Sequence, residues 1–248
     1  MVTSNHQVST MLAHEAGELL VRVRSELSAD DATTLRATGD RRSHDLLMSR
    51  LAELRPDDAV LSEEGSDDPV RLESDRVWIV DPLDGTREFS EPPRTDWAVH
   101  VALWERGQLV AGAVALPALG VTLGTDPAPA TPARPTGRLR VVASRTRPGP
   151  AADAVTAALD ATLVPMGSAG AKAMAVVRGE AEIYAHTGGQ YEWDSAAPVA
   201  VARAAGLHAS RIDGTALEYN QPDVYLPDLL ICRPELATRC IEALRGCG

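Results

Sequence analysis

The sequence is poor in aromatic residues, and it holds a single lysine and few cysteines. Aromatic residues make up 4% of the 248 residues, Phe89 is the sole phenylalanine, and Lys172 is the sole lysine. No apolar run approaches the ~20 residues that a membrane-spanning helix needs. The N-terminus lacks the apolar core of a signal peptide. We therefore expect no membrane segment and no export signal.

The three cysteines lie near the C-terminus, at positions 232, 240 and 247. Their number is odd, and no C-x-x-C pair or zinc-finger spacing is present. This pattern favours free thiols in a reducing compartment over a disulfide framework. Together with the missing export signal, it predicts a cytoplasmic protein.

Basic residues are outnumbered by acidic ones, 24 to 35, which gives a formal net charge of -11. A general nucleic-acid binder or a binder of anionic membranes needs a basic face, so we expect neither partner. Hydrophobic residues make up 44% of the chain, as in ordinary globular proteins. If the substrate is an anion, a bound divalent metal ion is the simplest way to reverse the local field.

The first half of the chain alternates helical and strand patterns. Asp40 precedes the second helical pattern, which predicts that it lies in a loop or caps that helix. The hairpin is expected to turn at Arg106 and Gly107. The apolar periodicity predicts helices over 6–27 and 41–54, strands over 59–64 and 76–81, a hairpin over 96–117 and a strand over 120–125.

Residues 126–137 carry four prolines and no large apolar residue, which is typical of a linker. After them, strands and helices alternate, and this pattern predicts α/β layering. We therefore expect two parts, an N-terminal domain over 1–130 and a C-terminal domain over 131–248. The predicted C-terminal elements are strands over 139–144, 162–166, 181–185 and 225–233, and helices over 150–160, 168–178, 194–205 and 234–246.

The most informative segment is VWIVDPLDGTREF, residues 77–89. Its apolar strand ends at Asp81, where Pro82 interrupts the hydrogen-bond ladder, and Asp84 follows after a turn. Carboxylates at this spacing can converge on a hard cation, with the carbonyl of Leu83 as a further oxygen ligand. Gly85 allows close approach of backbone N–H groups to a phosphate, and a helix starting there would favour that anion. The segment suits metal-assisted phosphate chemistry.

Two rival readings of this segment fail, and one stays open. A calcium-binding loop counted from Asp81 would need glycine and glutamate where Thr86 and Pro92 stand. Phosphatases that form an aspartyl-phosphate use D-x-D-G-T, and Pro82 stands at the position of their nucleophile. A plain Asx turn followed by an acid-capped helix remains compatible with these residues alone.

Further acids stand at the ends of other predicted elements. Glu63 and Glu64 close a short strand, and Asp194 stands where a helix begins. Each has an ordinary explanation, either a solvated loop or a helix N-cap. All three lie at strand ends or helix starts, and a crevice between layers would lie at these positions.

Taken in order, LSEEG (61–65), DPLDGT (81–86) and WDSAA (193–197) make the chain resemble the inositol monophosphatase superfamily of magnesium-dependent, lithium-sensitive phosphatases. DGTREF, VVASRT (141–146), GSAGAK (167–172) and LEYN (217–220) are most similar to its CysQ-type 3'-phosphoadenosine 5'-phosphate phosphatases. The resemblance implies an α/β fold, a layered α-β-α-β-α sandwich of two stacked halves with the metals in the cleft between them.

The resemblance also implies residue roles. Glu63, Asp81, the Leu83 carbonyl, Asp84 and Asp194 would bind two or three Mg²⁺ ions. Asp40 would pair with the Thr86 hydroxyl and polarise the attacking water, and Glu63 would also be catalytic. The implied substrate-binding residues are Gly85, Thr86, Ser144, Arg145, Gly167, Ser168, Lys172 and Tyr219.

The implied reaction is hydrolysis of the 3'-phosphate of 3'-phosphoadenosine 5'-phosphate to AMP, in sulfate assimilation, with 3'-phosphoadenylyl sulfate as a further candidate substrate. Inositol monophosphatase and fructose-1,6-bisphosphatase activities are alternatives with the same chemistry. A non-catalytic metal or nucleotide sensor is an alternative of another class. Small nucleotide bisphosphates are the expected partners, and homodimers are common among such enzymes.

Overall fold

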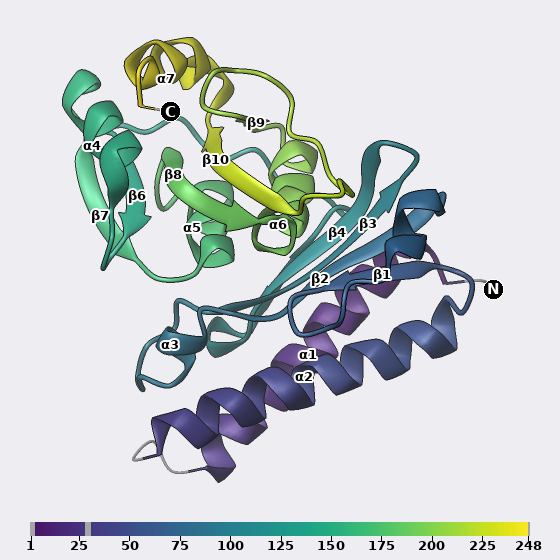
Figure 1. Cartoon of the computed structure of the whole chain (residues 1–248). Coiled ribbons are helices and arrows are strands. Elements are labelled where there is room, and N and C mark those ends of the chain that lie inside the picture. The colour runs from purple at the N-terminus through teal and green to yellow at the C-terminus, as the bar shows by residue number, and fades with distance from the viewer. Residues whose placement is uncertain (1–2, 28–30, 248) are drawn as a thin grey trace.

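The computed structural model describes residues 3–27 and 31–247 (Figure 1). Two five-stranded sheets dominate it, with strand orders β1-β2-β3-β4-β5 and β7-β6-β8-β10-β9. The first half contains α1 (Asn5–Glu26), α2 (Ala32–Leu54), β1 (Ala59–Ser62), β2 (Arg76–Asp84), α3 (Thr86–Phe89), β3 (Ala98–Glu105), β4 (Gln108–Leu116) and β5 (Val121–Gly124). The second contains β6 (Arg140–Ser144), α4 (Gly149–Ala158), β7 (Thr162–Met166), α5 (Ala169–Val177), β8 (Ile183–Tyr191), α6 (Glu192–Ala204), β9 (His208–Ser210), β10 (Tyr225–Cys232) and α7 (Ala237–Leu244).

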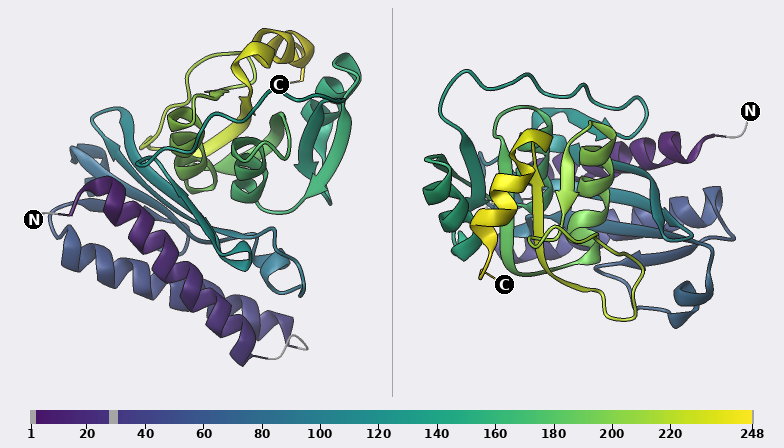
Figure 2. Two further views of the ribbon diagram at one scale, coloured as in Figure 1. Left: turned by 180° about the vertical axis from the view of Figure 1, so that it is seen from behind. Right: turned by 90° about the horizontal axis from the view of Figure 1, so that it is seen from above.

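The elements stack in five layers. Helices α1 and α2 cover one face of the first sheet, and α5 and α6 lie between the two sheets. Helices α4 and α7 cover the outer face of the second sheet (Figure 2). The predicted α-β-α-β-α arrangement is confirmed. No helix in the described part of the chain is long and apolar enough to span a membrane.

Helix α1 follows directly from its sequence. Its apolar side chains recur at helical spacing and are buried against the first sheet, with Leu12 and Leu20 fully enclosed. Ser4 and Gln7 form a capping box that satisfies the free N–H groups at its start. The hairpin is also where the sequence predicted it, because β3 and β4 are joined at Arg106 and Gly107.

Helix α2 begins earlier than predicted. Asp31 caps it by accepting a hydrogen bond from the Thr34 peptide N–H at 3.0 Å, so the expected loop before Asp40 is helical. Gly39 lies inside this helix and serves close packing. A Cβ at this position would lie 2.8 Å from the Phe89 ring. Asp40 is therefore presented from a rigid helix.

Strand β2 also differs from its prediction, because it continues past Pro82 to Asp84. It pairs with β1 in parallel and with β3 antiparallel, and its register with β3 shifts between Asp81, which faces His100, and Asp84, which faces Ala98. Residues three apart on a regular strand point to opposite faces. The bulge adds a residue, so both aspartates share the face of His100 and Ala98.

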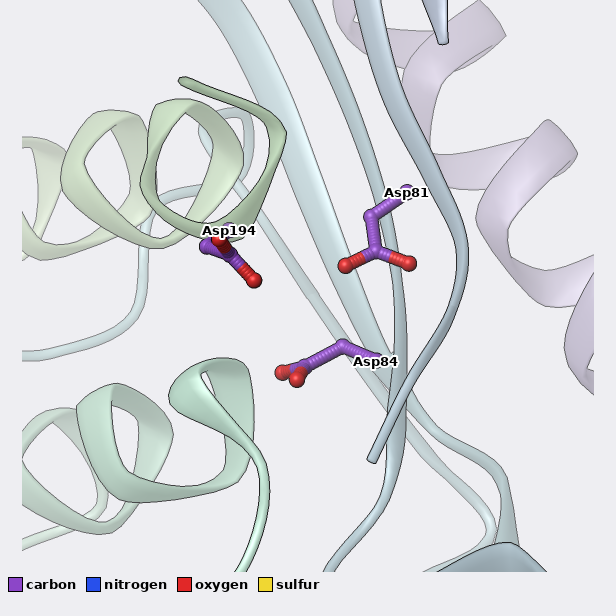
Figure 3. Close-up of side chains that lie close together, drawn as sticks. All are labelled: Asp81, Asp84 and Asp194. Atoms are coloured by element: carbon purple, nitrogen blue, oxygen red, sulfur yellow. The ribbon is translucent and has the colours of Figure 1, made fainter. Parts of the chain in front are cut away.

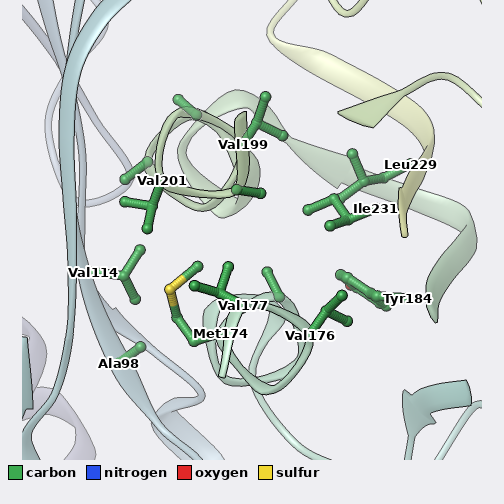
Figure 4. Packing of buried hydrophobic residues seen from close by; sticks show 14 of the residues in the cluster. Ala98, Val114, Met174, Val176, Val177, Tyr184, Val199, Val201, Leu229 and Ile231 are labelled. Atoms are coloured by element: carbon green, nitrogen blue, oxygen red, sulfur yellow. The ribbon is translucent and has the colours of Figure 1, made fainter. Parts of the chain in front are cut away.

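The interior between the sheets joins both halves of the chain. Met174 of α5 and Val201 of α6 pack there with Val114 of the first sheet and Ile231 of the second, all almost fully buried (Figure 4). Residues 126–139, which contain the predicted linker, are neither helix nor strand. The division into two domains at residue 130 stays a prediction.

Candidate functional site

Three acidic side chains from two elements point into one space (Figure 3). Asp81 and Asp84 come from the bulged end of β2, and Asp194 comes from the first turn of α6. One carboxylate oxygen from each lies within 4.8 Å of the others. Asp81 and Asp84 are only 1% and 7% exposed, so little water reaches them. A bound cation would offset the mutual repulsion of such buried negative charges.

The electrostatics agree with a cation site. Burial raises the pKa of Asp81 well above its usual range, and the charges of Glu63 and Asp84 add to this shift. Burial and then Asp84 raise the pKa of Asp194 to about 6. The available ligand atoms are carboxylate oxygens, the donor type that hard divalent cations prefer. These residues therefore fit a metal ion.

Glu63 stands at the rim of this cluster. It follows β1, and its peptide N–H donates to the carbonyl of Val80, beside Asp81. Residue Glu63 is exposed at the surface, as is Glu64. Desolvation of its carboxylate by nearby protein atoms raises the pKa of Glu63 to about 7, and the charges of Asp194 and Asp84 add to this shift.

Asp84 is held by the start of α5, on the opposite side of the site. The Ser168 hydroxyl donates to its Oδ2, Ala169 N–H donates to its Oδ1 at 3.1 Å, and Gly170 N–H donates to its Oδ2 at 2.6 Å. Burial alone would raise the pKa of Asp84, but His100, Lys172 and Ser168 lower it to about 2. Asp84 is therefore an ionised, well-oriented carboxylate.

The Thr86 hydroxyl lies between two oxygen acceptors. It is 3.4 Å from Oδ1 of Asp40 and 3.1 Å from the Leu83 carbonyl. Leu83 N–H in turn donates to Oδ1 of Asp81, which helps to hold the residue that presents this carbonyl. Burial and then Glu64 raise the pKa of Asp40 to about 7, against opposing effects of Thr86 and Arg36. A carboxylate near neutral pKa is suited to accept a proton.

Lys172, an expected substrate contact, is buried in α5. Its Nζ donates to the carbonyls of Ser168 at 2.6 Å and Gly167 at 3.3 Å, and it lies over the Tyr184 ring. The side chain therefore braces the turn that carries Ser168. Gly85 packs against Ser168 from the other half of the molecule. Direct contact of Lys172 with a substrate stays a prediction.

The other expected substrate contacts are spread over the rim and the interior. Arg145 forms ion pairs with Glu88 at 2.6 Å and Glu91 at 2.7 Å, which tie it to α3. Ser144 accepts a hydrogen bond from the Arg147 N–H. Tyr219 is 4% exposed, and its hydroxyl is 3.1 Å from that of Ser195. The roles proposed for these residues stay predictions.

Sequence reasoning missed His100, which lies at the centre of the site. Its Nε2 is 3.2 Å from Oδ2 of Asp84, and its Nδ1 is 3.0 Å from the Trp193 carbonyl and 3.9 Å from Oδ2 of Asp81. Burial alone would lower the pKa of His100, but contact with Asp84 outweighs it and raises the pKa. The available signal was a single polar residue inside the apolar run WAVHVALW.

A two-sheet α/β sandwich with acids converging between its halves defines the class of protein. The chain belongs to the inositol monophosphatase family, whose model matches residues 2–248. This confirms the resemblance predicted from the ordered motifs.

Within this family, the chain is similar to several named proteins. The 3'-phosphoadenosine 5'-phosphate phosphatase of Mycobacterium tuberculosis is 54% identical over 238 residues, which are 93% of this chain and 89% of that protein. The 3'(2'),5'-bisphosphate nucleotidase CysQ of Escherichia coli is 31% identical over 235 residues, 87% of this chain and 94% of that protein. The crystal structure of CysQ from Bacteroides thetaiotaomicron has a TM-score of 0.75 at 27% identity, and the alignment covers 93% of this chain and 97% of that one.

Proposed function

We propose that the protein is a Mg²⁺-dependent phosphatase that hydrolyses the 3'-phosphate of 3'-phosphoadenosine 5'-phosphate, which yields AMP and inorganic phosphate. The observation that carries this proposal is the convergence of Asp81, Asp84 and Asp194 beside the Asp40–Thr86 pair, in a chain 54% identical to a phosphatase named for this substrate.

The proposed metal ligands are Glu63, Asp81, the Leu83 carbonyl, Asp84 and Asp194, and we propose two or three Mg²⁺ ions. When bound, Mg²⁺ would neutralise phosphate charge and favour in-line displacement of the leaving oxygen. The donors at the start of α5 orient Asp84, and His100, Lys172 and Ser168 keep it ionised. Without the metal, burial and then the repulsion among these acids raise the pKa values of Asp81 and Asp194.

Asp40 and Thr86 are proposed to handle the proton. The Thr86 hydroxyl would accept a hydrogen bond from the attacking water and donate one to Asp40. Because the pKa of Asp40 is about 7, its carboxylate can then take up the proton near neutral pH. The peptide N–H groups of Gly85 and Thr86 would bind the phosphate oxygens.

Residues of the second half would form the nucleotide side of the pocket. We propose that Ser144 and Arg145 contact the nucleotide at the rim, because both are partly exposed. Gly167 and Ser168 would line the pocket next to Gly85. Lys172 and Tyr219 are buried, so they would act through the Gly167–Ser168 turn and through Ser195.

The test is phosphate release from 3'-phosphoadenosine 5'-phosphate, 3'-phosphoadenylyl sulfate, inositol 1-phosphate and fructose 1,6-bisphosphate, each with and without Mg²⁺. We expect the highest kcat/KM for the first, no turnover without Mg²⁺, and AMP as a product that resists further hydrolysis. A hundredfold preference for inositol 1-phosphate would show that the substrate is wrong. Tight nucleotide binding without turnover of any substrate would favour a sensor.

The wider setting follows as part of the proposal. We propose that the enzyme serves sulfate assimilation in the cytoplasm, where its three cysteines stay free thiols, as they are in the structure. Family resemblance also predicts inhibition by lithium and a homodimer. Phosphate release with added LiCl and sedimentation of the purified protein test these two points.

A further inference from the structure

The imidazole of His100 contacts three elements that surround the acidic cluster. It lies at the middle of β3 and is fully buried. Nε2 faces Oδ2 of Asp84 on β2 at 3.2 Å, and Nδ1 lies 3.0 Å from the Trp193 carbonyl on α6. Since Asp194 follows Trp193 directly, a single ring lies between the two elements that carry the proposed metal ligands.

The start of α5 closes over the same ring. A Cβ on Gly170 would lie 2.0 Å from Nε2 of His100, so no other residue allows this close approach. The Gly170 N–H donates to Oδ2 of Asp84, the oxygen that Nε2 also faces. The amide and the imidazole thus converge on one carboxylate oxygen.

A histidine is a costly choice for this position. Its neighbours on the same face of β3, Ala98 and Ala102, are small and apolar, and burying a polar ring costs free energy unless it has partners. The described residues give Nε2 no hydrogen bond of good geometry, although Asp84 lies within reach. The contacts of Nδ1 with the Trp193 carbonyl and of Nε2 with Asp84 offset part of that cost.

We propose that His100 is a positioning residue for the metal site, and this inference rests on the proposed function. Its Nδ1 contacts the start of α6, which carries Asp194, and its Nε2 edge packs 3.2 Å from the carboxylate of Asp84. The ring thereby sets the separation of two metal ligands that come from opposite halves of the molecule. It acts through these ligands and touches neither substrate nor metal.

The test compares three variants of the full chain. His100→Leu removes both polar contacts, His100→Asn keeps a donor near the Nδ1 position, and His100→Gln keeps one near the Nε2 position. The main readout is Mg²⁺ affinity by titration calorimetry, without substrate, because groups that orient metal ligands typically change affinity by about 10–100-fold. His208→Asn, at the half-buried edge strand β9, is the matched control.

We expect His100→Leu to weaken Mg²⁺ binding at least tenfold, with partial recovery in His100→Gln or His100→Asn and no change in His208→Asn. In turnover assays kcat should fall while KM stays within about twofold. A folded His100→Leu protein that binds Mg²⁺ within twofold of the parent would overturn the proposal. If that variant fails to fold, His100→Asn and His100→Gln decide: Mg²⁺ affinity within twofold of the parent in both variants would overturn the proposal. Normal Mg²⁺ binding without nucleotide hydrolysis would instead overturn the proposed function.

Discussion

The two halves of the molecule contribute different chemistry to one site. The first half supplies Asp81, Asp84 and Glu63 from strands or their ends. The second supplies mainly donors, the Ser168 hydroxyl and the N–H groups of Ala169 and Gly170, together with the single carboxylate of Asp194. The register of the strands determines where the acids of the first half lie. The donors reach Asp84 only when α5 is docked, so the ordered site depends on docking of the halves.

The largest effect on turnover is expected from Asp84, which belongs to the first half and is held by donors of the second. Asp84→Asn should lower kcat by about 10³-fold, because the loss of one charged ligand removes several kcal/mol of transition-state stabilisation. Mg²⁺ binding should weaken in parallel, while circular dichroism stays unchanged. Steady-state kinetics and calorimetry measure both. Asp153→Asn, an exposed aspartate on α4, is the control. Undiminished turnover of Asp84→Asn would contradict the role of this residue.

Comparing the stability of the protein with and without Mg²⁺ tests whether the clustered acids bind the ion together. At pH 8, Mg²⁺ at a hundredfold excess over its Kd should raise Tm by about 5–10 °C, measured by differential scanning fluorimetry against NaCl of equal ionic strength.

The shift in Tm should shrink at lower pH. The pKa values of Glu63 and Asp194 are raised to about 7 and about 6, above the values near 4 of the unfolded chain. Their contribution to the stability of the metal-free protein is therefore full below pH ~4 and is lost as the pH rises through 6 to 7. Metal binding relieves this loss, so the gain should be larger at pH 8 than at pH 5.5. Equal shifts at both pH values would contradict this explanation.

The donors of the second half should have a smaller effect than the acids. Ser168→Ala removes the cap of α5 and a hydrogen bond to Asp84, so we expect about 1 kcal/mol lower stability and a 10–100-fold lower kcat. Urea unfolding and steady-state kinetics measure the two quantities. Ser25→Ala removes an exposed hydroxyl of α1 and should change neither. A loss of stability without a loss of kcat would mean that Ser168 serves α5 alone.

The rim should show the smallest effect. Arg145→Met breaks the two ion pairs to Glu88 and Glu91, and partly exposed pairs contribute only about 0–1 kcal/mol. We expect KM to rise about fivefold, with kcat within twofold. Arg178→Met, which breaks an ion pair with Glu180, is the control. A drop in kcat with unchanged KM would place Arg145 in the chemical step.

The sequence predicted local elements better than the contacts between them. The hairpin at Arg106–Gly107 and most helices follow from patterns within one element, and their bounds agree with the structure to within a few residues. The predicted start of α2 was too late, and Gly39 in its interior is required by packing against Phe89, fifty residues away. The short strand β9 went unnoticed because three residues carry too little periodicity.

The candidate site shows the same limit. The spacing of Asp81 and Asp84 and the helix start at Asp194 predicted acids that converge, and these three do lie together. His100 was missed, because only the register of β2 with β3 brings it opposite Asp81. Arg145 and Lys172 were expected from the resemblance to contact the substrate, which stays a prediction, and the structure shows that they also have Glu88, Glu91 and backbone carbonyls as partners.

The bulge in β2 has a consequence for how this chain can vary. Insertions in the proline-rich segment 126–137 would only lengthen a connection at the surface. Adding or deleting one amino acid between Asp81 and Asp84 would invert the parity of the pleat and send one acid toward α2. The bulge therefore constrains the length of that stretch, and the buried side chain of Leu83 constrains its composition as well.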